Sequence, residues 1–290
     1  MNSNPSLRTK LSNREFIVAP GVYDGITTRF AAEHNFDALY MTGHGISISS
    51  AGIPDIGTAT YTEMVRGVEL ITGLTRIPLI ADADTGFGAL LNVERTIRGY
   101  ERAGAAAIQL EDQAFPKKCG HTPNRRLVDT GEMVKKLRVA VDTRSTREFL
   151  IIARCDARSS YGLDEALRRG EQYLNAGADI LFIESPETEE EIRTIGRSFS
   201  DRWLLANVVD GGGRTPMLSA STLKELGFSI AIHPGTALMA AAAAFRGIYS
   251  FLHKQRTSIG IDVPMMPFDD WVKATGFPQA WAFEEKYEQT

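Results

Sequence analysis

Short apolar runs recur along the chain, and each is followed by a stretch whose apolar residues return at helical spacing. The intervening stretches, such as NVERTIRGYERAG and LDEALRRGEQYLNAG, have the pattern of amphipathic helices. The apolar runs are nearly continuous, which is typical of parallel strands covered on both faces. Eight such runs are present, at residues 16–24, 37–43, 77–84, 105–113, 149–157, 179–185, 203–210 and 229–235.

This order of elements predicts an α/β fold, a (β/α)₈ barrel of the TIM type. Parallel strands need a crossover of about a dozen residues or more, and eight strand–helix units in roughly 250 residues match the count and size of that barrel. AGAAAI and AGADIL both end a helix with Ala-Gly just before a strand, as an αβ turn requires. No linker is evident, so we expect residues 1–290 to form a single domain with a C-terminal helical extension from about residue 255.

Charge and cysteine content narrow the class of partner. The chain has 32 basic and 36 acidic residues, a net charge of −4 and no long basic stretch, which predicts a small-molecule partner and no nucleic acid. Two cysteines cannot make a disulfide framework, and the N-terminus lacks the apolar region of a secretory signal, so we expect a cytoplasmic protein. GTALMAAAAAFRGIYSFL is Ala-rich and interrupted by Arg246, which predicts a packed helix and no membrane attachment.

Polar residues gather where the predicted strands end. In such barrels reactive groups lie at the carboxyl ends of the strands, so these side chains are expected to share one mouth. Each of them alone also has a structural explanation, such as a helix cap or a turn. The residues are Tyr40, Thr42, Gly43, Asp82, Asp84, Glu111, Asp112, Arg154, Asp156, Glu184, Asn207, Asp210 and His233.

Several carboxylates in one mouth repel one another unless a cation neutralises them. DADTGFG places Asp82 and Asp84 at i and i+2, which on an extended strand face the same side, and Glu111 adds a third carboxylate from the next strand. Oxygen ligands without a His or Cys cluster favour Mg²⁺, or Mn²⁺, over zinc. A lone D-x-D pair is weak evidence, and Glu111 strengthens it.

FPKKCGHTPNRR follows the fourth strand, in a loop of about fifteen residues, a length typical of functional lids. Lys117, Lys118 and His121 are expected to lower the pKa of the Cys119 thiol, which could then act as nucleophile or general acid–base. The alternative is an incidental exposed cysteine in a basic loop. Cys155, inside the apolar run IIARCDA, is interpreted as a core residue.

DADTGFG, LEDQ, KKCGH, IIARCDA and LLAN, in this order, resemble the isocitrate lyase and phosphoenolpyruvate mutase superfamily. The resemblance runs from about Phe16 to Tyr249, and APGVYDG, YMTGHGIS and GIPDIGTATYTEM are most similar to its short-chain members, including 2-methylisocitrate lyase and 2,3-dimethylmalate lyase. It implies a Mg²⁺ cofactor, an enolate-type intermediate, and a homotetramer whose C-terminal helices swap between subunits.

The resemblance also implies roles. In the metal site, Asp84 would be the direct ligand, Asp82 and Glu111 would hold metal-bound water, and Asp55 would lie near the ion. The implied catalytic residues are Cys119 as general acid, Tyr40 as base or orienting group, His121 and Arg154. The implied substrate-binding residues are Thr42, Gly43, His44, Gly120, Arg154, Glu184, Asn207 and His233.

Taken together, these features predict a Mg²⁺-dependent carbon–carbon lyase that cleaves a substituted malate or 2-methylisocitrate to pyruvate and a second carboxylic acid. An oxaloacetate hydrolase, a phosphorus–carbon mutase and a non-catalytic binding barrel are the alternatives. His44, His233 and the loop DGGGRTP (210–216) depart from the family pattern, so they bear on the side group accepted.

The terminal segment 267–290 is rich in aromatic residues, more than a solvated tail should expose. We expect it to pack on a neighbouring subunit, with packing on its own barrel as the alternative. The aromatic residues are Phe268, Trp271, Phe277, Trp281, Phe283 and Tyr287.

Overall fold

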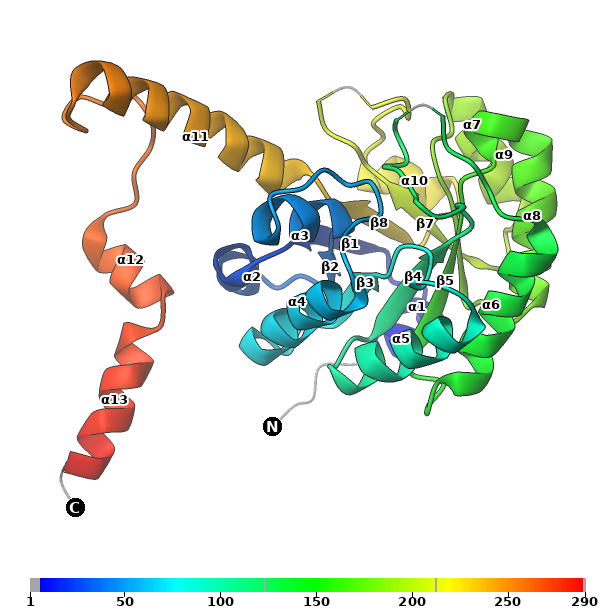
Figure 1. The fold of residues 1–290 in the computed structure, drawn as a ribbon, viewed down its shortest axis with the longest axis horizontal. Coiled ribbons are helices and arrows are strands. Elements are labelled where there is room, and N and C mark those ends of the chain that lie inside the picture. The colour runs from blue at the N-terminus through cyan, green and yellow to red at the C-terminus, as the bar shows by residue number, and fades with distance from the viewer. Residues whose placement is uncertain (1–5, 123, 212, 289–290) are drawn as a thin grey trace.

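Eight parallel strands close into a barrel in the order β1 to β8, and β8 pairs with β1 through Ile230 and Ile17. This computed structural model describes residues 6–122, 124–211 and 213–288 (Figure 1). Each predicted apolar run contains one strand, so the TIM-type barrel is confirmed. The strands are β1 (Ile17–Val22), β2 (Leu39–Met41), β3 (Leu79–Asp82), β4 (Ala107–Glu111), β5 (Leu150–Cys155), β6 (Ile180–Ile183), β7 (Trp203–Asn207) and β8 (Ile230–His233).

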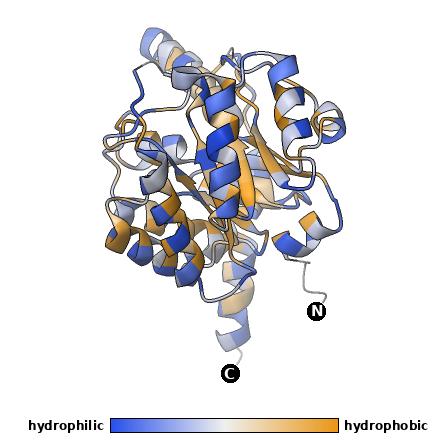
Figure 2. Ribbon diagram, turned by 90° about the vertical axis from the view of Figure 1, so that its right-hand side faces the viewer, coloured by the Kyte–Doolittle hydropathy of each residue, from blue (hydrophilic) through white to orange (hydrophobic). Residues whose placement is uncertain are grey.

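Helices surround the barrel and turn their apolar faces toward it. Figure 2 shows hydrophobic residues concentrated on the strands, behind a helix whose outer surface is largely hydrophilic. These helices are α1 (Leu7–Ser12), α2 (Gly25–Ala32), α3 (Gly43–Ser50), α4 (Tyr61–Leu74), α5 (Leu90–Arg102), α6 (Thr130–Thr143), α7 (Arg158–Tyr161), α8 (Leu163–Asn175), α9 (Glu189–Ser198) and α10 (Ala220–Glu225).

The strands end earlier than the apolar runs predict. The second run was expected to reach residue 43, but β2 ends at Met41 because Thr42 turns out of the ladder and caps α3. Its hydroxyl accepts a hydrogen bond from the Gly45 N–H, as an N-cap residue does. Residues after the strands therefore form the loops that carry the polar side chains.

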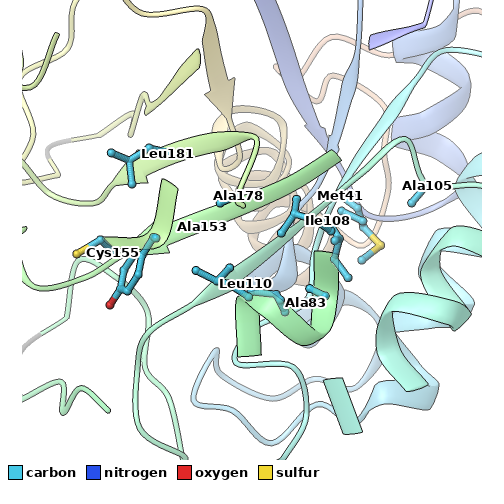
Figure 3. Packing of buried hydrophobic residues seen from close by; sticks show 14 of the residues in the cluster. Met41, Ala83, Ala105, Ile108, Leu110, Ala153, Cys155, Ala178 and Leu181 are labelled. Atoms are coloured by element: carbon cyan, nitrogen blue, oxygen red, sulfur yellow. The ribbon is translucent and has the colours of Figure 1, made fainter. Parts of the chain in front are cut away.

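The core has two layers, one inside the barrel and one between the strands and the helices. Figure 3 shows part of the outer layer, where Leu110, Ala153 and Leu181 pack around Cys155. Cys155 is fully buried, and its Sγ lies 3.9 Å from the Ala166 carbonyl oxygen. The prediction that Cys155 is a core residue is confirmed.

Three helices follow β8 and lie apart from this core except at the start of the first: α11 (Thr236–Gln255), α12 (Phe268–Ala274) and α13 (Phe277–Glu288). They extend away from the barrel (Figure 1), and none of them has a buried residue. The expectation of a packed helix is met at the start of α11, where Leu238 packs against the core, and not along the rest of the helix within a single chain. Among the described residues no helix is long and apolar enough to cross a membrane.

One pair of glycines tests the packing of the helical layer. A Cβ on Gly196 of α9 would lie 1.7 Å from the Leu226 carbonyl oxygen, whereas a Cβ on Gly73 of α4 would meet nothing within 4 Å. We expect Gly196→Ala to destabilise the fold by about 1–3 kcal/mol, because the backbone at 226 must shift. Gly73→Ala should be neutral or stabilise by up to about 1 kcal/mol. Thermal unfolding of both variants checks the opposite signs.

Candidate active site

Three carboxylates meet at the carboxyl ends of β3 and β4. Asp82 ends β3, Glu111 ends β4, and both are at least nine-tenths buried, as is Asp84. Asp84 does not continue the strand, because its φ of 48° lies in the left-handed region. Its N–H donates to Asp82 Oδ1 at 3.1 Å. The expectation of an extended D-x-D pair is therefore wrong, and a tight turn brings the two side chains together.

Lys117 supplies positive charge to this cluster. Its Nζ lies 2.5 Å from Asp55 Oδ1 and 2.7 Å from Asp84 Oδ1, and the side chain is only 3% exposed. Lys118 instead donates from Nζ to the Asn124 carbonyl oxygen. A cavity of about 630 Å³, lined in part by Asp84 and Lys117, opens beside the cluster. The sequence alone could not predict that Lys117, and not its neighbour Lys118, would point toward the carboxylates.

The carboxylates still need more positive charge than Lys117 provides. Burial raises the pKa of Asp84 to about 6, against the opposing effect of Lys117. Burial also raises the pKa of Glu111 well above its usual range, although Arg154 and Lys117 oppose this. Lys117 is the contact of Asp84 Oδ1, whereas neither Glu111 oxygen has a hydrogen-bond partner among the described residues. Buried carboxylate oxygens without donors are the ligands that a hard divalent cation prefers, so these residues fit the expected ion.

A relay beneath the carboxylates holds Asp82 in place. The Tyr40 hydroxyl donates to Gln109 Oε1 at 3.1 Å, and Gln109 Nε2 donates to Asp82 Oδ1 at 3.3 Å. The Gly43 N–H lies 3.3 Å from the other oxygen, Asp82 Oδ2. Burial, followed by the charge of Asp82, raises the pKa of Tyr40 well above its usual range. Of the two expected roles of Tyr40, this neutral phenol favours orientation over proton abstraction. Gln109 was missed because it lies within an apolar run.

Arg154 forms the opposite side of the site. It makes a two-point contact with Asp156, from Nε to Oδ2 and from Nη2 to Oδ1, each at 3.0 Å. Its guanidinium also lies 3.4 Å from Glu111 Oε2 and 3.5 Å from Glu184 Oε2. Arg154 therefore joins the carboxylates of β4 to those beyond β5 and β6.

Glu184 gathers two further residues expected to contact substrate. Asn207 Nδ2 donates to Glu184 Oε2 at 3.1 Å, and His121 Nε2 lies 3.3 Å from Glu184 Oε1. Burial opposes ionisation of Glu184, but Arg154, His121 and Asn207 together lower the pKa of its carboxyl group to about 2. Glu184 is therefore a stable anion in this side of the site.

The loop after β4 lies between the carboxylate cluster and the Arg154–Glu184 pair, and hydrogen bonds hold it there. The Cys119 N–H donates to the Asp55 carbonyl oxygen at 3.1 Å, and the Gly120 carbonyl oxygen accepts from Ser185 Oγ at 2.9 Å. A Cβ on Gly120 would lie 2.3 Å from Arg154 Nη2, so only glycine permits this approach. Cys119 is thereby held between Asp55 and the Arg154–Glu184 pair.

The thiol pKa differs from the expectation. Burial raises the pKa of Cys119, and the backbone N–H of His121, which favours the thiolate, does not offset it. Lys117 and Lys118 are engaged elsewhere. The predicted lowering of the thiol pKa is therefore wrong, and a protonated thiol is what a proton donor requires.

Two histidines at the mouth differ in their surroundings. His44 is exposed on α3, and its imidazole, the Asp55 carboxylate and the Cys119 thiol offer ligand atoms within 4.8 Å of one another. His233 ends β8, and no hydrogen bond or ion pair joins its side chain to another described residue. Two strand-end residues expected in the mouth are engaged elsewhere: Asp112 pairs with Arg169 and Tyr173 of α8, and Asp210 accepts from the Thr236 hydroxyl. His233 has no such link to the site. The loop 210–216 includes residue 212, which lies outside the described residues.

Comparison with known proteins agrees with this geometry. The family described as phosphoenolpyruvate phosphomutase matches residues 7–252. The chain is 45% identical to 2,3-dimethylmalate lyase of Eubacterium barkeri, over 99% of both chains. It is 44% identical to 2-methylisocitrate lyase of Aeropyrum pernix, over 82% of this chain and 76% of that one. A structure of oxaloacetate acetylhydrolase with 3,3-difluorooxalacetate is 33% identical, with a TM-score of 0.92 over 98% of this chain and 96% of that one.

The chain belongs to the phosphoenolpyruvate mutase/isocitrate lyase superfamily. The resemblance seen in its motifs is thereby confirmed. As a member of this superfamily, with full-length identity to a named lyase, the chain is an enzyme, a carbon–carbon lyase.

The raised thiol pKa of this superfamily member can be tested by alkylation. Iodoacetamide reacts with the thiolate, so the rate at Cys119 should stay low at pH 7–8 and climb only above the ordinary thiol pKa of 9.0. The rate is measured by mass spectrometry against pH, with Cys119→Ala used to subtract reaction at Cys155. A rate that already levels off below pH 8 would show a lowered pKa instead.

Proposed function

We propose that this enzyme is a Mg²⁺-dependent lyase that cleaves a 2-hydroxy di- or tricarboxylate to pyruvate and a second carboxylic acid. The observation that carries the proposal is the position of Cys119, a protonated thiol held between Asp55 on the carboxylate side and Arg154 with Glu184 on the other. This arrangement provides a proton donor beside sites for a cation and for an anionic substrate.

The names of the two similar lyases favour a substituted malate or 2-methylisocitrate as substrate. A second candidate is hydrolysis of oxaloacetate to oxalate and acetate, which the likeness to oxaloacetate acetylhydrolase favours. Both reactions start from a small acid with several carboxylates, so the same cationic groups serve either.

Asp82, Asp84 and Glu111 would hold the ion, with Asp55 nearby, because three buried carboxylates meet there and neither Glu111 oxygen has a hydrogen-bond donor among the described residues. The all-oxygen set fits Mg²⁺ and would also accept Mn²⁺. When bound, the ion would supply a Lewis acid toward substrate oxygens. Lys117 stands close to the same carboxylates and limits their mutual repulsion.

The protein's own groups would bind and orient the substrate. Thr42, Gly43 and His44, at the start of α3, would hold the pyruvyl carboxylate, and Arg154 would add positive charge. The Tyr40 relay through Gln109 keeps Asp82 in one orientation. The remaining part of the substrate would meet Gly120, Glu184, Asn207 and His233.

Proton delivery falls to Cys119. As the bond between C2 and C3 breaks, the C2 hydroxyl gives its proton to a carboxylate of the cluster and becomes the pyruvate carbonyl, and the electron pair of the broken bond passes to the departing acid. The Sγ–H proton of Cys119 is transferred to the carbon that holds this pair, and the thiolate then regains a proton from water. His121 and Arg154 hold Glu184 beside the loop and so help to position the thiol. Closure of the loop, with Gly120 packed against Arg154, would exclude water during this step.

We also propose that the whole chain, 1–290, acts as a single barrel domain in a cytoplasmic homotetramer. The extension from about residue 255 to 290 would be swapped onto a neighbouring subunit. The exposed aromatic side chains of α12 and α13, such as Trp281 at 54% exposed, support this because isolated proteins rarely leave such surface uncovered.

The substrate proposal is tested by a panel of acids with Mg²⁺: 2,3-dimethylmalate, 2-methylisocitrate and oxaloacetate. Pyruvate is measured with lactate dehydrogenase, and oxalate is measured separately. We expect pyruvate from one of the first two acids. Oxalate from oxaloacetate alone would favour the hydrolase.

Cys119→Ser tests the proton donor on whichever acid is cleaved. A hydroxyl has a far higher pKa than a thiol, so kcat should fall roughly 10²- to 10⁴-fold with a much smaller change in KM. Steady-state kinetics checks this, and Cys155→Ala is the matched control for loss of a thiol from the core. Wild-type kcat in Cys119→Ser would remove the thiol from the mechanism.

Asp84→Asn tests the metal ligands. Asn tolerates the left-handed backbone at this position, so the variant removes the charge without adding the strain that Ala would bring. Mg²⁺ should raise the unfolding temperature of the wild type and leave that of Asp84→Asn almost unchanged, with turnover lost. A variant that Mg²⁺ stabilises as much as the wild type contradicts the assignment.

The oligomer is tested by light scattering at micromolar concentration. We expect the mass of a tetramer, and a smaller species when Trp281 and Phe277, which stack at 5.8 Å between ring centroids, are replaced together by Ser. A monomeric wild type would decide for packing of the extension on its own barrel.

A further inference from the structure

The imidazole of His44, the carboxylate of Asp55 and the thiol of Cys119 converge beside the carboxylate cluster, to which Lys117 joins Asp55. Their ligand atoms lie within 4.8 Å of one another, and they come from α3, from the segment that follows it and from the loop after β4. We propose that these three residues form a second metal site, which takes a soft divalent ion such as Zn²⁺.

The site is built by loops that are already in contact. The Cys119 N–H donates to the Asp55 carbonyl oxygen, and a Cβ on Gly57 would lie 2.8 Å from the Lys117 backbone nitrogen. The segments 55–57 and 117–119 therefore run against each other, and two of the three ligands are fixed relative to one another before any ion arrives.

The three side chains have ligand atoms that are free to bind an ion. Lys117 occupies Asp55 Oδ1 at 2.5 Å, which leaves the second carboxylate oxygen available. The His44 side chain is exposed, and among the described residues no hydrogen bond or ion pair holds its imidazole. Ligands around tetrahedral zinc are roughly 3.5 Å apart, given metal–ligand distances of about 2.0–2.3 Å, so a shift of about 1 Å completes the set.

The chemistry of the three groups separates this site from the carboxylate cluster. Sulfur, nitrogen and oxygen from Cys, His and Asp are the ligands of zinc, whereas the oxygen-only cluster suits Mg²⁺. Binding would break the S–H bond, form a metal–sulfur bond and release the proton to water. Three protein ligands leave one coordination position for water.

If Cys119 is the proton donor, as the proposed function requires, metal binding at this site would inhibit the enzyme. Cys119 bound to an ion has no proton to deliver, so occupancy would inhibit the lyase even when Mg²⁺ is saturating. Inhibition would follow the free concentration of the soft ion and be reversed by a chelator.

Cobalt is the probe, because thiolate bound to Co²⁺ gives a charge-transfer absorption in the near ultraviolet. The full-length protein is titrated with Co²⁺ in excess Mg²⁺. We expect the thiolate band in the wild type, its removal by Zn²⁺, and its loss in Cys119→Ser.

His44→Asn should weaken cobalt binding on the order of 10-fold or more, because a direct ligand is lost. Cys155→Ala, and His34→Asn at another exposed histidine, should bind cobalt like the wild type.

Absence of the band in the wild type, a band that survives in Cys119→Ser, or unchanged affinity in His44→Asn would overturn the site. These readouts do not depend on turnover. A band with the expected variant pattern, in a protein that cleaves none of the acids in the panel, would support the site and overturn only the proposed function.

Discussion

Mutual repulsion of buried carboxylates is the constraint on which the mouth of this barrel depends. Asp82, Asp84 and Glu111 are withdrawn from water at the ends of neighbouring strands, and burial raises the pKa of Asp84 and of Glu111. Lys117 contacts Asp84 and Arg154 approaches Glu111, yet neither oxygen of Glu111 has a hydrogen-bond donor among the described residues. Because these carboxylates have too little positive charge around them, the site is suited to a divalent ion and to the anionic substrate that the ion binds.

The loop after β4 meets several requirements within five consecutive residues, 117–121. Lys117 supplies charge to the carboxylates, Cys119 supplies a thiol, Gly120 permits contact with Arg154, and His121 approaches Glu184. Because these residues are adjacent in the chain, movement of Lys117 cannot be separated from movement of Cys119. The charge state of the carboxylates and the position of the thiol are therefore mechanically linked.

The barrel could be predicted from the sequence because apolar runs and helical periodicity are local signals. The polar residues at strand ends were found for the same reason, since the fold itself places them in one mouth. Local geometry was not accessible: the left-handed turn at Asp84 and the inward choice of Lys117 over Lys118 depend on contacts between distant segments. The thiol pKa was predicted with the wrong sign because sequence proximity to lysines was taken for spatial proximity, while burial decides it.

The backbone at position 84 restricts which residues could ever serve there. A ligand role requires a carboxylate, and a φ of 48° favours Asp, Asn or Gly over longer side chains. Aspartate is the residue that satisfies both demands, because its short side chain tolerates the left-handed region and still carries charge. Glutamate would keep the charge but adopt this backbone at a cost and carry its carboxylate farther from the turn. Two acidic residues that are interchangeable on most surfaces are therefore not equivalent at this point of the barrel.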